Sequence, residues 1–166
     1  MASIRGPRVA TIGVHGFSDE TFVAALRESA VTVVLDLRAR RGVRGSDYAW
    51  ANSKRLQGLL AAAAVGYRHL PALAPTDDLR RLQYRADDRA GVGKRSRAAL
   101  APEFRDRYGR EILDGADLGE LVAGLPAEGV WALLCVEREP QACHRSLVAA
   151  AFAREFGASV VDVVPA

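Results

Sequence analysis

The sequence predicts an α/β protein, a three-layer sandwich in which helices cover both faces of a mainly parallel sheet of about five strands. Three observations carry this prediction. The 166 residues are 49% hydrophobic and 26% charged, a balance typical of one globular domain with a single core. Short runs rich in β-branched residues alternate with segments whose apolar residues recur at helical spacing. These runs are apolar on both faces, as parallel strands are when helices cover each side of the sheet.

The first half of the chain alternates regularly between the two kinds of segment. Ser18, which two acidic residues follow, is placed to cap the first helix. Asn52 or Ser53 can cap the second helix, and Gly66 is expected to close it near its C-terminal cap. The strands expected in this half span residues 9–14, 32–37 and 67–70.

The second half interrupts the alternation and then resumes it. Residues 71–129 carry only short helical patterns, so we expect an insertion within the single domain that spans residues 1–166. Residues 130–136 are the most apolar run and form the fourth expected strand. A helix over about residues 142–156 and a last strand over residues 160–164 complete the chain.

The expected topology places the functional site. Successive strand, helix and strand segments form right-handed parallel crossovers, and the Rossmann-like strand order 3-2-1-4-5 follows if two such halves diverge between the first and fourth strands. Ligands of open parallel sheets bind outside the carboxyl ends of the strands at such a point. Function is therefore predicted at this edge of the sheet.

Polar residues follow the expected strands at this edge. Asp36 ends a covered strand, where a carboxylate must be paired, and Arg38 is the nearest cation. This pair is either part of a binding site or a structural ion pair. The residues predicted to bind a ligand are Gly13, His15, Asp36, Arg38, His69, His144 and Arg145.

The segment after the fourth strand carries the candidate catalytic residues. Cys143 is expected in or beside the first turn of the last helix, where free N–H groups and a neighbouring cation, Arg145, lower the pKa of a thiol. Cys143 is therefore either a catalytic nucleophile or a small buried residue that closes the turn. Glu137 either orients Arg145 or His144 or acts as a general base. Cys135, inside the covered strand, is interpreted as core packing.

Several classes of protein and site are not expected. No apolar stretch reaches the roughly 18 residues of a membrane span, and no apolar signal region opens the chain, so we expect a cytoplasmic protein without a membrane partner. The two cysteines and three histidines show no paired metal-ligand spacing, which predicts no metal site. Without a G-x-G-x-x-G sequence, no dinucleotide cofactor is expected either.

Positive charge is concentrated in one part of the chain. The net charge is +3, but the segment between Arg80 and Arg110 contains ten basic and four acidic residues, a local charge of +6. This basic segment is either a nucleic-acid footprint or a solvated surface in a chain that has 21 Arg and only 2 Lys.

Five short motifs stand in order along nearly the whole chain. They are Thr11-Ile-Gly13, Leu35-Asp-Leu-Arg38, Tyr67-Arg-His-Leu-Pro71, Leu133-Leu-Cys-Val-Glu137 and Cys143-His-Arg145. Together they resemble the bacterial and archaeal family known as domain of unknown function 488. The resemblance implies an α/β domain with this polar set at one sheet edge, and it implies no particular reaction.

The leading functional hypothesis is a pocket for an anionic, phosphate-bearing ligand, such as a nucleotide or a nucleic-acid end. Arg145, Arg38 and the N-terminus of the last helix would hold the anion. Asp36 and Glu137 would orient the arginines, and Cys143 would be the nucleophile in any covalent chemistry. The alternatives are a non-catalytic nucleic-acid-binding module that uses the basic segment, and a protein-interaction domain whose polar cluster is structural. The reaction and the oligomeric state stay open.

Overall fold

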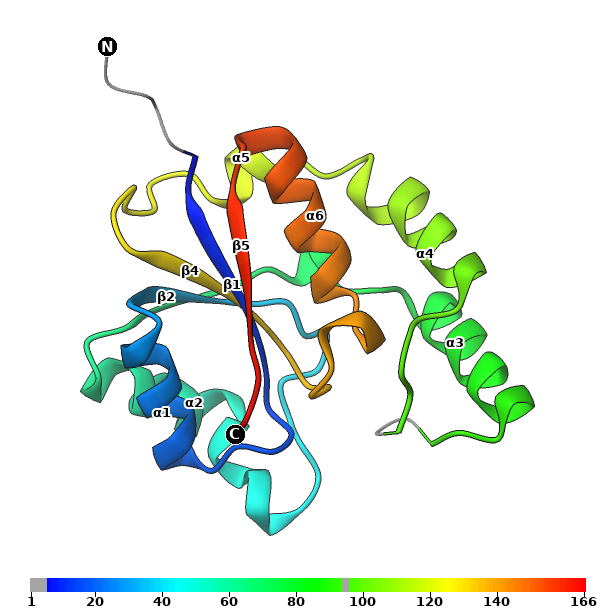
Figure 1. The fold of residues 1–166 in the computed structure, drawn as a ribbon, viewed down its shortest axis with the longest axis horizontal. Helices are drawn as coiled ribbons and strands as arrows, with labels where there is room; N and C mark the ends of the chain where they lie inside the picture. The colour runs from blue at the N-terminus through cyan, green and yellow to red at the C-terminus, as the bar shows by residue number, and fades with distance from the viewer. Residues whose placement is uncertain (1–5, 94–95) are drawn as a thin grey trace.

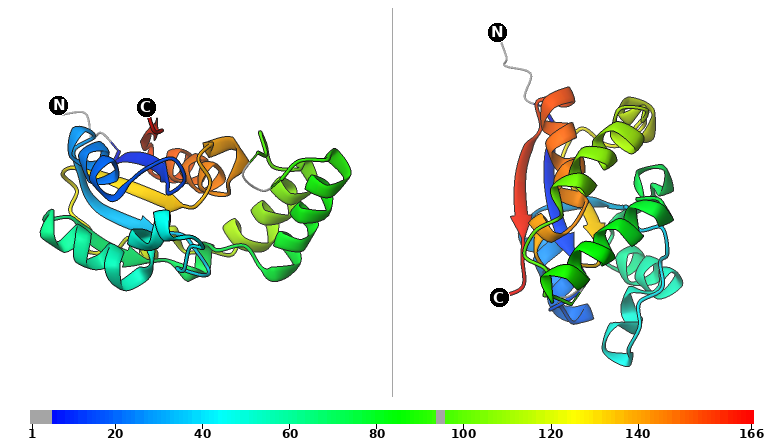
Figure 2. Two further views of the ribbon diagram at one scale, coloured as in Figure 1. Left: turned by 90° about the horizontal axis from the view of Figure 1, so that it is seen from below. Right: turned by 90° about the vertical axis from the view of Figure 1, so that its right-hand side faces the viewer.

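A five-stranded, all-parallel sheet lies between two layers of helices, which confirms the predicted fold class (Figures 1 and 2). The computed structural model describes residues 6–93 and 96–166. The strands are β1 (Arg8–Gly13), β2 (Val31–Asp36), β3 (Gly66–His69), β4 (Val130–Cys135) and β5 (Ser159–Val163).

The order of the strands differs from the predicted 3-2-1-4-5. The observed order is β3-β2-β4-β1-β5, so β4 lies at the centre of the sheet and pairs with β2 on one side and β1 on the other. All six residues of β4 are buried, and helices cover both of its faces. A central strand is shielded from water by a neighbouring strand on each side and by helices on both faces. This position therefore suits β4, the most apolar strand. The alternation of strands and helices along the chain does not encode this choice.

Helices α1 (Asp19–Glu28) and α2 (Ser53–Ala62) cover one face of the sheet (Figure 1). Ser18 caps α1 as predicted, because its Oγ accepts the backbone N–H of Thr21. The apolar sides of both helices pack on the sheet, and the fully buried residues of this core include Ile12, Val34, Phe22, Leu26, Leu56 and Leu60.

The prediction that Gly66 closes the second helix is wrong. The helix ends at Ala62, and Ala64 makes the turn into the next strand with φ of 57°. Gly66 is instead the first residue of β3, where it pairs with Val33 of β2 and a Cβ atom would lie 3.3 Å from Val33 Cγ2. An alanine adopts the left-handed conformation for which a glycine was expected. The position of the glycine therefore predicted the wrong end for this helix.

The opposite face is covered by α6 (Arg145–Phe156) and by the insertion. The insertion over residues 71–129 folds into α3 (Asp77–Ala90), α4 (Pro102–Tyr108), a π-helical turn (Gly109–Leu113) and α5 (Leu118–Leu121). Helices α3 and α4 pack against each other and project to one side of the sheet (Figures 1 and 2). No helix in the described part of the chain combines the length and the apolar character that membrane crossing requires.

The last helix starts later than the predicted residue 142. A short 3-10 turn (Pro140–Ala142) comes first, Cys143 is extended, and His144 occupies the N-cap position of α6. Pro140 opens this turn, since its fixed φ suits the first position of a helical turn. The delay leaves Cys143 and His144 in the loop between β4 and α6.

Candidate functional site

The chain connections separate at the carboxyl end of β4. The segments that leave β1 and β2 lead to α1 and α2 on one face, whereas the segment that leaves β4 leads to α6 on the other. Ligand crevices in open parallel sheets form at such points. A cavity of about 710 Å³ lies here, walled by the loops after β2 and β4, by α3 and by the residues just before α6.

Five of the nine predicted site residues line this cavity, and four do not. The lining residues are His15, Arg38, Glu137, Cys143 and His144. The others, which lie behind the wall, are Gly13, Asp36, His69 and Arg145. The predicted edge of the sheet therefore contains the cavity, but the roles of its residues divide into lining and support.

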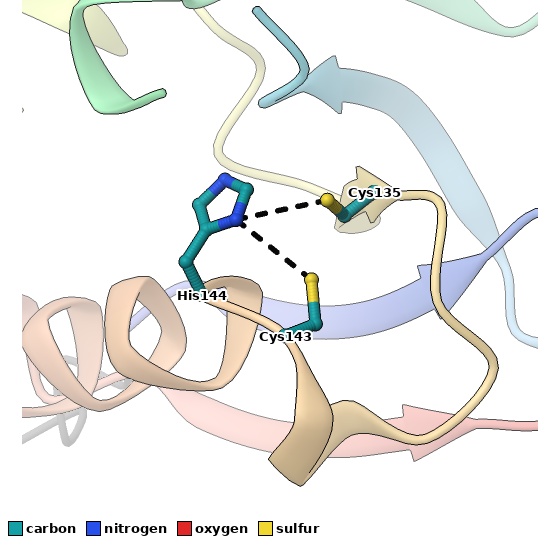
Figure 3. Close-up of side chains that lie close together, drawn as sticks. All are labelled: Cys135, Cys143 and His144. Atoms are coloured by element: carbon teal, nitrogen blue, oxygen red, sulfur yellow. Dashed lines mark hydrogen bonds between the residues drawn. The ribbon is translucent and has the colours of Figure 1, made fainter. Parts of the chain in front are cut away.

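Three buried side chains meet at the wall of the cavity. His144 Nδ1 lies 3.7 Å from the Sγ atom of Cys135 and 3.9 Å from the Sγ atom of Cys143. Figure 3 shows both sulfurs directed toward this one ring nitrogen, Cys135 from the end of β4 and Cys143 from the turn before α6. We call these three residues the thiol–imidazole cluster. Cys135 is buried, as predicted for a core residue, but its position at the end of its strand also places it in this cluster.

The two thiols of the cluster differ in acidity. Burial favours the neutral form of the Cys143 thiol, but the hydrogen bond from Cys135 and the positive charges of His144 and Arg145 outweigh burial and hold its pKa well below the ordinary value. The pKa of the Cys135 thiol lies well above its ordinary value, because the hydrogen bond to Cys143, burial and the nearby negative charges all disfavour its thiolate. Cys143 is therefore the thiolate of the pair.

The imidazole of the cluster is oriented by its second nitrogen. His144 Nε2 lies 3.3 Å from the carbonyl oxygen of Leu37, and the ring packs against Tyr108 with centroids 5.7 Å apart. Burial lowers the pKa of His144, but the charge and hydrogen bond of the Cys143 thiolate raise it, and the net shift is upward. Each of the two groups therefore favours the charged form of the other.

Arg145 supports the loop that carries this cluster. Its side chain is completely buried, and its guanidinium donates from Nη1 to the carbonyl of Glu137 and from Nη2 to the carbonyl of Arg138, the latter at 2.9 Å. No described residue accepts a hydrogen bond from its Nε. The sequence assigns this arginine to an anion, whereas its position behind the wall makes it an anchor of the loop after β4.

Gly13 permits a close approach of β1 to the same loop. A Cβ atom on Gly13 would lie 1.9 Å from the carbonyl oxygen of Glu137. The next backbone N–H groups, of Val14 and His15, donate to the carbonyl of Val136 at 3.1 and 3.0 Å. Glycine is therefore needed here for space and not to contact a ligand.

Replacing Gly13 with alanine is expected to lower the free energy of unfolding by about 1–3 kcal/mol, because the atom that must move belongs to the backbone of a pinned loop. Gly58→Ala is the matched control: Gly58 lies on the exposed side of α2 with no atom near its would-be Cβ. That change is expected to stabilise the protein by roughly 0.5–1 kcal/mol through helix propensity. Urea unfolding measures both, and equal effects of the two substitutions would contradict the close approach.

Asp36 and Arg38 form a buried, two-pronged ion pair. Arg38 Nε donates to Asp36 Oδ1 at 2.8 Å and Nη2 to Oδ2 at 2.9 Å, with Asp36 0% and Arg38 2% exposed. The third branch, Nη1, donates to the carbonyl of Ala51, and the hydroxyl of Tyr67 donates to Asp36 at 2.7 Å. Asp36 therefore orients Arg38 at the cavity wall and also ties β2 to β3.

The two remaining predicted histidines lie outside the thiol–imidazole cluster. His69 Nε2 lies 2.6 Å from the carbonyl oxygen of Arg38 and is half-buried behind the wall. His15 lines the cavity, with its ring 5.0 Å from the ring of Tyr48. Neither joins the thiol–imidazole cluster.

The sequence analysis missed the arginines that the insertion and the loop after β2 bring to the cavity. Arg97 is buried, pairs with Asp87 at 2.6 Å and donates to the carbonyl of Ala142 at 3.0 Å, next to Cys143. The other arginines of the wall are Arg40, Arg44, Arg80 and Arg81. Arg80, Arg81 and Arg97 belong to the basic segment that the sequence singled out, whereas Arg40 and Arg44 have no signal beyond the abundance of arginine in this chain.

Much of the charge of the basic segment is compensated locally. Arg81 pairs with Asp78 at 3.3 Å, Arg107 with Glu111 at 2.6 Å and Arg110 with Asp106 at 2.9 Å, and Arg80 pairs with Asp77. Asp77, Asp78 and Glu111 lie just outside residues 80–110, so their negative charges do not enter the local charge of +6. Helical spacing of three and four residues brings these charges together.

Comparison with known proteins identifies one family. A protein-family model described as "Domain of unknown function DUF488" matches residues 18–152, which include β2, β3, β4 and the whole thiol–imidazole cluster. The searches of curated proteins and of solved structures gave no match.

Proposed function

We propose that this chain, which belongs to the family described as domain of unknown function DUF488, binds an anionic, phosphate-bearing ligand in its cavity, over a reactive thiolate, Cys143. The proposal is argued from the site because the description of the family names no activity. The ligand class is a nucleotide or a nucleic-acid end. The single observation that carries the proposal is the positive charge of the cavity wall, whose lining residues include six arginines and only two carboxylates. The arginines are Arg38, Arg40, Arg44, Arg80, Arg81 and Arg97.

Four of these arginines already have carboxylate partners, and two do not. Arg38, Arg80, Arg81 and Arg97 form the ion pairs described above. Arg40 and Arg44, both exposed on the loop after β2, form no ion pair with another described residue. Guanidinium groups bind phosphate oxygens through charge-assisted, two-pronged hydrogen bonds. Arg40 and Arg44 are therefore the proposed phosphate anchors, in place of the buried Arg145.

The thiolate supplies the chemical group at the wall. The lowered pKa of the Cys143 thiol supports a role as nucleophile or ligand, since the thiolate is the reactive form in either role. Glu137 lies on the same wall, with Oε2 3.7 Å from Cys135 Sγ, where it is placed to act as a general base.

The double variant Arg40→Ala/Arg44→Ala is expected to weaken binding of pyrophosphate at least tenfold, because each charge-assisted contact to phosphate contributes on the order of 1.5 kcal/mol or more. Isothermal titration calorimetry of the full chain measures the loss. Arg154→Ala is the matched control, an exposed arginine near the end of α6 that does not line the cavity. An unchanged affinity in the double variant would place the anion elsewhere.

Salt separates this function from the nucleic-acid-binding alternative. A surface that tracks a phosphate backbone releases one condensed counterion for each contact, so its affinity falls steeply as salt rises. A pocket that holds one phosphate group makes few such contacts and loses less affinity. Binding of a 5′-phosphorylated oligonucleotide with a shallow salt dependence, and competition by pyrophosphate, are expected for the cavity.

A further inference from the structure

We infer that Cys135, Cys143 and His144 bind one thiophilic divalent metal ion, with Zn²⁺ as the best match, through two thiolates and the imidazole Nδ1. The inference rests on the proposed function only for the ligand that would reach the metal, and it assigns Cys143 to coordination in place of direct attack. The sequence predicts no metal site because Cys135 and Cys143 are eight positions apart and match no paired ligand spacing. The fold removes that objection by turning the chain back at the end of β4.

The donor atoms have the separations that a metal ion imposes. Tetrahedral zinc, with Zn–S near 2.3 Å and Zn–N near 2.05 Å, places a sulfur and a nitrogen donor about 3.6 Å apart. The two sulfur–nitrogen distances in the cluster are 3.7 and 3.9 Å. All three donor atoms lie within 4.8 Å of one another. A metal ion would fit with shifts of a few tenths of an ångström along the sulfur–nitrogen edges.

The imidazole is oriented as in metal-binding histidines. A carbonyl oxygen only accepts hydrogen bonds, so the approach of the Leu37 carbonyl to His144 Nε2 places a hydrogen on that nitrogen. The other nitrogen, Nδ1, then points at both sulfurs (Figure 3). Histidine ligands of metals nearly always donate their second ring N–H to a carbonyl or carboxylate in this way.

The donors are held by contacts that do not depend on a metal. Arg97, which Asp87 fixes, donates to the carbonyl of Ala142 directly before Cys143. The hydroxyl of Ser146 donates to the carbonyl of Cys143 at 2.9 Å. A site that is ordered before binding loses little conformational entropy when the metal arrives.

Burial and charge favour a dication here. Cys135, Cys143 and His144 are each at most 6% exposed. Two thiolates with a neutral imidazole carry a charge of −2, so a divalent ion gives a neutral complex, which has the smallest cost of burial. Soft sulfur ligands together with one imidazole favour zinc over magnesium or calcium, which take oxygen donors.

The fourth coordination position faces the cavity. All three cluster residues belong to its wall, and three protein ligands with one open position are the arrangement of catalytic zinc sites, whereas structural sites are closed by four. The open position is available to water or to an oxygen of the proposed phosphate-bearing ligand.

Cobalt titration of the full-length, chelator-stripped protein under a phosphine reductant tests the inference. We expect one Co²⁺ per chain, with thiolate charge-transfer absorption near the ultraviolet edge and the visible bands of tetrahedral cobalt, all lost when Zn²⁺ is added. Cys135→Ser, Cys143→Ser and His144→Gln are each expected to weaken Zn²⁺ binding by about 100-fold or more. Circular dichroism checks that each variant is folded, and His144→Gln remains informative if a cysteine variant fails to fold.

His69→Gln is the matched control for the histidine. His69 also directs its Nε2 at a backbone carbonyl at this edge of the sheet, but it lies outside the cluster, so its replacement is expected to leave metal affinity unchanged. The metal site would be overturned if Co²⁺ added to the stripped wild-type protein produced no thiolate or tetrahedral bands. Equal Zn²⁺ affinity of His144→Gln and the wild type would also overturn it.

Metal binding and phosphate binding are measured separately. Arg40→Ala/Arg44→Ala leaves the cluster intact and is expected to bind Co²⁺ like the wild type. If that variant and the wild type bind Co²⁺ while neither binds pyrophosphate, the metal site stands and the proposed function fails. If pyrophosphate binds the stripped protein through these arginines and no metal binds, the proposed function stands and the metal site fails.

Discussion

Replacing Asp36 with alanine is expected to lower the free energy of unfolding by about 3–5 kcal/mol, because it leaves the Arg38 guanidinium buried and unpaired. Arg38 is 2% exposed and makes both of its charge-assisted contacts to this one carboxylate. The hydroxyl of Tyr67 loses its acceptor in the same variant. Urea unfolding followed by circular dichroism measures the loss.

Asp78→Ala is the matched control for this experiment. Asp78 also pairs with an arginine, but both side chains are largely exposed, and such pairs contribute little to stability because water and salt screen them. Its melting temperature is expected to stay within a degree or two of the wild type. Equal stability of the Asp36 and Asp78 variants would show that the buried pair does not stabilise the fold.

Asp36→Asn separates support of the fold from support of the site. Asparagine keeps an acceptor oxygen and the shape of the side chain but removes the charge that orients Arg38. Because Arg38 lines the cavity, the variant is expected to lose affinity for pyrophosphate in the folded fraction. Destabilisation with undiminished affinity would assign Asp36 to the fold alone.

Cys143 is expected to react with a small alkylating reagent on the order of 100-fold faster than Cys135 at pH 6 in the metal-stripped protein. An ordinary thiol with a pKa of about 8.5 is only roughly 0.3% ionised at this pH. The lowered pKa of Cys143 gives it a larger thiolate fraction than an ordinary thiol at this pH, while the raised pKa of Cys135 keeps that residue neutral. Since a lowered pKa moves protonation of the thiolate to lower pH, the rate at Cys143 should fall less steeply between pH 8 and pH 6 than the rate of an ordinary thiol.

Peptide mapping of iodoacetamide adducts against pH assigns each rate to its cysteine. Cys143→Ser serves as the control and is expected to remove the fast phase. Labelling of both cysteines with one ordinary thiol pH profile would contradict the thiolate assignment. Saturating Zn²⁺ is expected to suppress the reaction, because a coordinated thiolate is shielded from the reagent.

The sequence by itself determined most of the helices and strands, though not all of their ends, and the edge of the sheet that carries the candidate site. Strands that are apolar on both faces, a capping serine before a helix and an interrupted alternation were sufficient for the α/β class and the helical insertion, since each signal depends on neighbouring residues. The Asp36–Arg38 pair was also accessible, because the two residues are two positions apart at the end of one strand.

Only the tertiary structure decided which strands are neighbours and which side chains meet. The central place of β4 depends on how much surface each strand buries against both helical layers, which is a property of the whole core. The turn of the chain after β4 brings Cys135 to Cys143 and His144, and it places Arg145 against the carbonyls of Glu137 and Arg138. Spacing along the chain carries no information about such contacts, because the packing of strands and helices, and not the number of intervening residues, sets the distances between their ends.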